Sequence, residues 1–323
     1  MKNLTRKMIT AGMAATMAAS LGIAANAEEA TYKVGICQLI QHEALDAATQ
    51  GFQDALTEKL GDRVEFDVQN ASGESVNCST IINGFVSDQV DLILANATGA
   101  LQAAVAGTSD IPILGTAVTD YATALDIDDW TGTVGGNVSG TSDCAPLDQQ
   151  AAMILELVPE AKTVGMLYCS AEPNSEYQVN VVTEALKELN PDLEIKNYTF
   201  ADSNDISSVA TSATECDVVY IPTDNTAANN TEAINNVMEP AGVPVIAGEA
   251  GICQGCGIAT LSISYYDLGY TTGEMAYEIL EEGADISTME VQYAPNVTKQ
   301  YMADRCEKLG ITVPDDYEAI EAE

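Results

Sequence analysis

The chain repeats a set of sequence landmarks at a nearly constant distance. Three landmarks that recur in the same order indicate two copies of one folding unit. The pairs and their offsets are VGI at 34–36 with VGM at 164–166 (130 residues), Asp91 with Asp217 (126), and IPI at 111–113 with VPV at 243–245 (132).

Short apolar stretches alternate with helical patterns in each copy. A strand expected at 32–37 precedes a helix at 42–60, whose apolar residues recur every three or four positions. Such alternation predicts parallel sheets covered by helices on both faces, and so an α/β chain of two Rossmann-like lobes. The other expected strands are 64–68, 91–95, 111–115, 163–169, 193–200, 217–221 and 243–247, and the other helices are 76–85, 98–106, 176–189, 205–214 and 226–239.

Residues 1–27 are expected to be a signal peptide. Lys2, Arg6 and Lys7 precede an apolar stretch, and the A-x-A sequence at 25–27 fits a cleavage site. An uncleaved membrane anchor is the alternative, although the stretch is short and rich in alanine for a span of ~20 residues. The mature chain is therefore expected in the periplasm or at the extracellular face of the cytoplasmic membrane.

The charge of the chain is strongly negative. The 49 Asp and Glu residues against 12 Lys and Arg give a net charge of −37 at pH 7. Such a field repels nucleic acid and anionic membrane surfaces and favours a monomer. We therefore expect no nucleic-acid partner.

The eight cysteines allow two interpretations. An even number in an exported chain suggests disulfides, but Cys37 and Cys169 end apolar strands and suit buried free thiols. Cys253 and Cys256 form the only C-x-x-C, far from the single histidine, His42. A structural loop, with or without a disulfide, is therefore favoured over a metal or redox site.

Motifs for catalysis are missing from the sequence. The glycine-rich segment at 132–136 lacks the lysine of a phosphate-binding loop, and the sequence contains no G-x-S-x-G motif. The acidic segment at 126–129 lacks the calcium-loop pattern, so a solvated turn is favoured there. We expect no enzyme activity, no catalytic residue, no cofactor and no metal.

Polar turns follow the expected strands in both lobes. Because ligands of open α/β sheets bind beyond the carboxyl ends of the strands, these turns predict a ligand cleft between the lobes. Helix starts at Thr98, Ser175 and Thr226 would direct N–H groups into it and favour a small anion such as a carboxylate. The turns are 38–42, 96–99 and 116–120 in the first lobe, and 170–175, 223–226 and 248–251 in the second.

Six segments, in order, carry a resemblance to a known family. They are VGICQLIQHEALDAATQGF, FVSDQVDLILANATGALQAA, IPILGTAVTD, LYCSAEPNSEYQ, VYIPTDNT and SISYYDLGYTTGEMA, between residue 33 and about residue 280. The chain resembles the solute-binding components of ABC transporters with the type I periplasmic-binding-protein fold. Within these it is most similar to the tryptophan- and tyrosine-type binding proteins.

The resemblance implies two lobes joined by three crossing segments. The first lobe would comprise 28–140 with a returning helix at about 264–286, and the second 141–263 with a C-terminal segment at about 290–315. The crossings are expected near 136–143, 260–264 and 287–293, and the last helix near 299–309.

The resemblance also implies a set of ligand-binding residues. The simpler alternative for most of them is a helix cap or a turn. In the implied roles, Gln38 and His42 meet the ligand side chain, Thr98, Thr119 and Asp120 supply hydrogen bonds, Asn174 and Ser175 bind a carboxylate, Asp224 with Asn225 binds an ammonium group, and Glu249 lies beside them.

The function implied is capture of a small amino-acid-like solute, aromatic or hydrophobic, by closure of the two lobes. An ABC permease in the membrane would then receive the solute. The alternatives are a binding protein for a sugar, nucleoside or other solute, or a ligand sensor for a membrane receptor.

Overall fold

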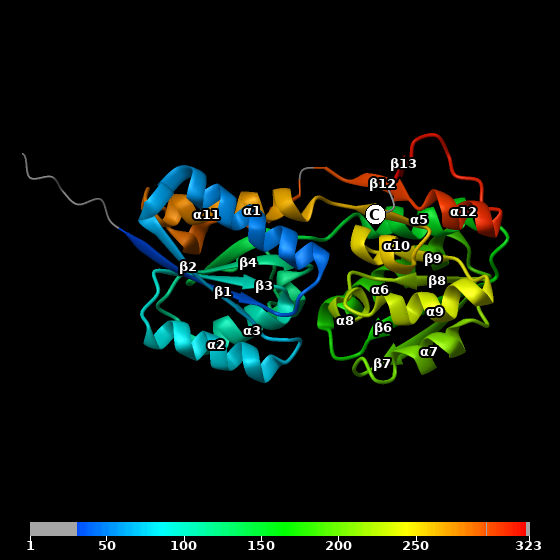
Figure 1. Ribbon diagram of the computed structural model, residues 1–323, viewed down its shortest axis with the longest axis horizontal. Coiled ribbons are helices and arrows are strands. Elements are labelled where there is room, and N and C mark those ends of the chain that lie inside the picture. The colour runs from blue at the N-terminus through cyan, green and yellow to red at the C-terminus, as the bar shows by residue number, and fades with distance from the viewer. Residues whose placement is uncertain (1–30, 295, 321–323) are drawn as a thin grey trace, which may run out of the picture. The chain divides into compact units, whose positions relative to one another are not determined.

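The computed structural model describes residues 31–294 and 296–320, which form two sheets with helices on both faces (Figure 1). The predicted signal peptide lies outside the described residues. The strands of the first sheet are β1 (Tyr32–Gln38), β2 (Val64–Asn70), β3 (Leu92–Asn96), β4 (Ile113–Val118), β5 (Val138–Ser142) and β11 (Gln292–Tyr293). They are arranged β11-β5-β4-β3-β1-β2, and all neighbours are parallel.

The second sheet combines five parallel strands with two from the end of the chain. Its strands are β6 (Thr163–Cys169), β7 (Glu194–Phe200), β8 (Val218–Ile221), β9 (Val245–Ala247), β10 (Ala259–Ser262), β12 (Thr298–Tyr301) and β13 (Glu318–Ala319). The order is β13-β12-β10-β9-β8-β6-β7, with β12 antiparallel to β10. The helix predicted near 299–309 is therefore wrong at its start, because residues 298–301 pair with β10 before the helix begins.

Helices cover both faces of the first sheet. They are α1 (Glu43–Leu60), α2 (Ser75–Ser87), α3 (Thr98–Gly107), α4 (Tyr121–Ala124) and α11 (Tyr265–Leu280), with short 3-10 turns at Gly61–Arg63 and Ile286–Thr288. Leu92 and Leu94 of β3 pack with residues of α1 and α11, whereas Ile93 and Ala95 pack with residues of α2 and α3. Both side-chain rows of the strand are thus buried, as the continuous apolar run predicts.

The second sheet has the same layered plan. Its helices are α5 (Leu147–Leu157), α6 (Pro173–Leu189), α7 (Ile206–Ala213), α8 (Asn225–Ala228), α9 (Thr231–Ala241), α10 (Ala250–Cys256) and α12 (Ala303–Leu309). One face packs against α5, α6 and α12, and the other against α7, α9 and α10. The single helix predicted at 226–239 is two helices, α8 and α9, with a break at Asn229 and Asn230.

The C-x-x-C segment is helical rather than the loop that the sequence suggested. Cys253 and Cys256 lie in α10, and all eight cysteines are free thiols. The Arg305 guanidinium donates to the backbone carbonyls of Cys253, Gln254, Gly255 and Gly257. Arg305 therefore bonds carbonyls at the end of α10 and at Gly257 just beyond it, where helix carbonyls run out of partners within the helix; the Cys253 carbonyl also accepts from the Gly257 N–H.

The chain passes between the sheets three times. The passages follow β5, β10 and β11. The first and third were expected at 136–143 and 287–293, but β5 and β11 still pair within the first sheet, so the chain leaves that sheet only after Ser142 and after Tyr293. After the second passage, α11 packs along α1, the two helices lying side by side in Figure 1.

Glycine permits the close packing of α1 and α11. A Cβ atom on Gly269 would lie 1.9 Å from the carbonyl oxygen of Ala48. We therefore expect Gly269→Ala to lower the free energy of unfolding by about 3 kcal/mol, since a backbone atom cannot move aside cheaply. Urea denaturation measures this. The matched control is Gly84→Ala in α2, where a Cβ meets no atom within 4 Å. This substitution should raise the free energy of unfolding by about 0.5–1 kcal/mol. Equal stability of the two variants would contradict the prediction.

Candidate functional site

A small cavity lies where carboxyl ends of strands from both sheets meet. It is lined by His42, Leu45, Ala117, Thr119, Asp143, Asn174, Thr223, Asp224, Asn225, Ala228, Glu249 and Tyr265. These include six of the ten predicted site residues, so the turns after the strands supply most of its wall. We call it the inner cavity. Its free space is about 10 Å³, room for about one water molecule, so its walls must separate to admit a larger solute.

Asp224 is the most heavily hydrogen-bonded carboxyl group of the inner cavity. Its Oδ2 accepts from the Cys169 N–H (2.7 Å) and the Ser175 hydroxyl (2.8 Å), and its Oδ1 accepts from the Ala227 N–H (2.8 Å) at the start of α8. Burial raises the pKa of Asp224 to about 8, with a further contribution from the Glu172 carboxylate, while these hydrogen bonds oppose the rise. Asp224 is thus both a helix cap and part of the cavity wall.

Glu249 plays the same structural role at the start of α10. Its two carboxyl oxygens accept from the N–H groups of Gly251 and Ile252. Burial raises the pKa of Glu249 to about 7, and the negative charges of Glu43 and Asp143 add to the rise. The helix cap therefore places a second buried carboxyl group at the inner cavity.

Asp143 is a third buried carboxyl group, which the sequence analysis did not single out. It follows β5 directly and is 6% exposed. Its Oδ2 accepts from the Tyr265 hydroxyl at 2.9 Å. Burial raises the pKa of Asp143, while the hydroxyls of Tyr265 and Thr119 oppose the rise. A polar residue immediately after a strand was the available signal, but residues 136–143 were interpreted as a crossing segment.

Side chains that follow strands of different sheets touch beside the inner cavity. His42 Nε2 lies 3.2 Å from Asn225 Oδ1, and the hydroxyl oxygens of Thr119 and Thr223 are 3.5 Å apart. The Gln178 amide donates to both of these threonine hydroxyls. Burial lowers the pKa of His42, so its ring is mainly neutral at pH 7. These uncharged contacts are weak individually and can break when the walls separate.

Four predicted site residues do not line the inner cavity. Gln38 is held inside the first lobe by Thr49, Asp46 and the Ile40 carbonyl. Thr98 is buried at the first position of α3, and Asp120 caps α4 through the Thr123 N–H. Ser175 lies behind Asp224, to which it donates. The structure therefore places these four outside the lining of the inner cavity.

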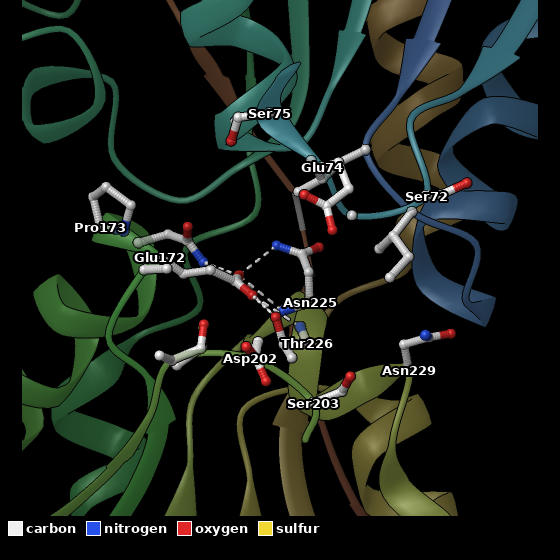
Figure 2. Close-up of a pocket in the computed structure, with 18 of the residues that line it drawn as sticks. Ser72, Glu74, Ser75, Glu172, Pro173, Asp202, Ser203, Asn225, Thr226 and Asn229 are labelled. Carbon is white, nitrogen blue, oxygen red and sulfur yellow. Dashed lines mark hydrogen bonds between the residues drawn. The ribbon is translucent and has the colours of Figure 1, made fainter. Parts of the chain in front are cut away.

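A larger cavity of about 420 Å³ adjoins the inner one. Figure 2 shows Glu172 at its wall, with its carboxylate directed at the start of α8. That carboxylate accepts from the backbone N–H and the side chains of both Asn225 and Thr226, at 2.7–3.0 Å. Asn174 and Asn225 line both cavities, so the Glu172 network forms part of the wall between them. The sequence analysis missed Glu172, although it lies in the expected turn at 170–175.

The electrostatics of the two cavities favour a cationic group on the ligand. Among residues 31–294 and 296–320, no lysine or arginine lines either cavity, whereas acidic residues line both. A cation bound there would be stabilised by buried carboxylates in a medium that screens charge poorly. In the described part of the chain, no group of three or more His, Cys, Asp or Glu residues suits a metal ion. None of its helices is long and apolar enough to span a membrane.

Two solved structures resemble the chain over most of its length. One is an ABC domain from Streptococcus pneumonia in complex with L-Trp, 29% identical, with a TM-score of 0.85 over 90% of this chain and 100% of that one. The other is a ligand-free, open structure of a substrate-binding protein with adhesive properties from Clostridium difficile, 34% identical, with a TM-score of 0.69 over 91% and 100% of the two chains.

Comparison of sequences also relates the chain to substrate-binding proteins. A tyrosine-binding protein from Clostridioides difficile (strain R20291) is 37% identical over 252 residues, which are 77% of this chain and 72% of the relative. The sequence model of the ABC transporter substrate-binding proteins matches residues 33–322. Two α/β lobes with a cavity at their strand ends are the architecture that such a protein needs, and the chain belongs to the ABC transporter substrate-binding protein family.

Proposed function

We propose that this substrate-binding protein captures an aromatic amino acid for import. The observation that carries the proposal is the inner cavity, where three buried carboxyl groups lie and the described lining holds no lysine or arginine. The ammonium group of an amino acid supplies the missing positive charge. The tyrosine-binding relative and the relative solved with L-Trp support an aromatic side chain.

The inner cavity also offers partners for the rest of an amino acid. Asn174 and Thr119 carry donors for the ligand carboxylate, and Asn225 and His42 complete the polar wall. Leu45 and Tyr265 present surface against which an aromatic ring would pack. Gln38, Thr98, Asp120 and Ser175 would have structural roles: Ser175 donates to Asp224, Asp120 caps α4, Gln38 accepts from Thr49, and Thr98 is buried at the start of α3.

Closure of two lobes is the proposed mode of capture. The expected boundary at residue 140 divides β5, so we assign residues 31–142 with α11 and β11 to the first lobe, and residues 144–262 with the segment from β12 onward to the second. A ligand that contacts residues of both lobes stabilises the closed state over the open one. The higher TM-score against the L-Trp complex than against the open, ligand-free relative, despite lower identity, supports this mode.

The closed form would deliver its ligand to a membrane permease. Residues 1–27 direct export in this proposal, and the mature chain works as a monomer outside the cytoplasmic membrane. We assign it no catalytic residue and no cofactor, because the ligand is released unchanged.

Thermal denaturation with a solute panel tests the proposal. The mature protein is unfolded, refolded to remove bound solute, and melted with each of the twenty amino acids, and with sugars and nucleosides as controls. We expect tyrosine, tryptophan or phenylalanine at a hundredfold excess over the dissociation constant to add about 2.7 kcal/mol, a rise of several degrees in Tm. A rise with a sugar or nucleoside only would reject the amino-acid ligand.

A further inference from the structure

We propose that Asp143, rather than Asp224, binds the cationic nitrogen of the ligand and so makes the site selective for amines. This deepens the proposed function and rests on it. Asp143 lines the inner cavity and is 6% exposed. Within the described residues its Oδ1 has no hydrogen-bond partner, although that oxygen is fully buried.

An unpartnered buried carboxyl oxygen is rare in folded proteins because it loses its hydration without compensation. Asp143 is nevertheless held firmly on its other side. The Tyr265 hydroxyl at the start of α11 donates to Oδ2 at 2.9 Å, and the Asp143 N–H donates to the Val118 carbonyl at 3.3 Å. These bonds fix the carboxyl group of a residue that lines the inner cavity, and they leave Oδ1 without a hydrogen bond.

The oxygens of the other two carboxyl groups in the inner cavity already accept hydrogen bonds from the protein. Asp224 accepts from three donors with its two oxygens, and each oxygen of Glu249 accepts from a backbone N–H. All these donors belong to the second lobe. Of the three, Asp143 alone has a buried oxygen that accepts no hydrogen bond among the described residues. The Thr119 hydroxyl lies near enough to lower the pKa of this carboxyl group but makes no hydrogen bond to it. An ammonium group has three N–H donors and no acceptor, so it matches this oxygen.

The position of Asp143 suits a selectivity residue. It follows β5, the last strand before the chain first passes to the second lobe, and it lies beside Thr119 and Glu249 in the cavity wall. A nitrogen bound to Oδ1 would therefore be within reach of both lobes. A ligand that lacks the nitrogen would leave the carboxyl group without its partner.

The test compares ligands with and without the amine. Titration calorimetry measures L-tyrosine and 3-(4-hydroxyphenyl)propanoate, which lacks only the amino group, against wild type, Asp143→Asn and the matched controls Asp224→Asn and Glu249→Gln. We expect Asp143→Asn to weaken tyrosine binding about 100-fold, the worth of a charge-assisted hydrogen bond. It should leave the des-amino compound nearly unaffected, so that the preference for the amine is lost.

The controls separate this role from a structural one. Asp224→Asn and Glu249→Gln should weaken the binding of both compounds alike and keep the preference for the amine. Asp143→Asn should melt at the wild-type temperature or above, because it removes a poorly solvated charge. An unchanged preference in Asp143→Asn overturns the proposal. If that variant does not fold, Asp143→Ser is measured in the same way. Failure of wild type to bind any amino acid would instead reject the proposed function, and with it the ammonium role of Asp143.

Discussion

Replacing Asp224 with alanine is expected to lower the free energy of unfolding by about 3 kcal/mol. The substitution leaves three donors without their acceptor: the N–H groups of Cys169 and Ala227 and the Ser175 hydroxyl. Each buried donor left unpaired costs about 1–3 kcal/mol, and relaxation recovers part of the sum. The bonds join the end of β6, the start of α6 and the start of α8. Urea denaturation followed by circular dichroism measures the loss.

Asp120→Ala is the matched control for this effect. Asp120 caps α4 as Asp224 caps α8, but through a single hydrogen bond among the described residues, from the Thr123 N–H, and in a partly exposed position. Loss of such a cap costs about 1 kcal/mol. If Asp224→Ala were no more destabilising than Asp120→Ala, the network around Asp224 would not stabilise the second lobe as described.

The stability of the ligand-free protein is expected to fall as the pH rises from about 4.5 to 7, in part through Glu249. Burial raises the pKa of Glu249 from 4.5 to about 7 in the folded state. The folded protein therefore binds a proton that the unfolded chain has already released, so the contribution is fully present below pH 4.5 and is lost as the pH approaches 7. At 1.36 kcal/mol per pKa unit, the change is on the order of 3 kcal/mol.

Glu249→Gln isolates this contribution from the other acidic residues. The amide does not titrate, so the variant should lose stability less steeply than wild type between pH 4.5 and 7. Denaturant unfolding at several pH values gives the difference between the two slopes. Parallel slopes would mean that Glu249 titrates normally, and that it is better solvated than its burial in α10 implies.

The fold could be predicted largely from the sequence because its signals are local. Apolar strands such as Leu92–Asn96 and Val218–Ile221 are buried on both faces, and each is followed by a polar turn and a helix. The short strands at the end of the chain escaped prediction. Gln292–Tyr293 and Glu318–Ala319 are exposed, two-residue strands that only their sheet partners define.

The inner cavity could be predicted only in part, because a residue's partner is often distant in the sequence. Asp143 meets Tyr265 across 122 residues, and no local pattern links them. Asp224 shows a second reason why the sequence does not determine the role of a site residue. A carboxylate after a strand serves equally as a helix cap or as a ligand partner, and its three donors are visible only in the folded structure.

The packing of α11 against α1 has a consequence for the order in which the chain assembles. Strands β6 to β10 follow one another in the sequence, with no strand of the other sheet between them, and can pair as soon as residue 262 has been synthesised. The first lobe must wait longer, because Phe52 of α1 packs in a cluster with Met275 of α11. Met275 is made 223 residues after Phe52, so at ribosomal rates of about 5–20 residues per second the apolar face of α1 waits on the order of ten seconds or more for α11. A circular permutant that begins at α11 would let this lobe form from nearly contiguous sequence, with apolar surface exposed for less time.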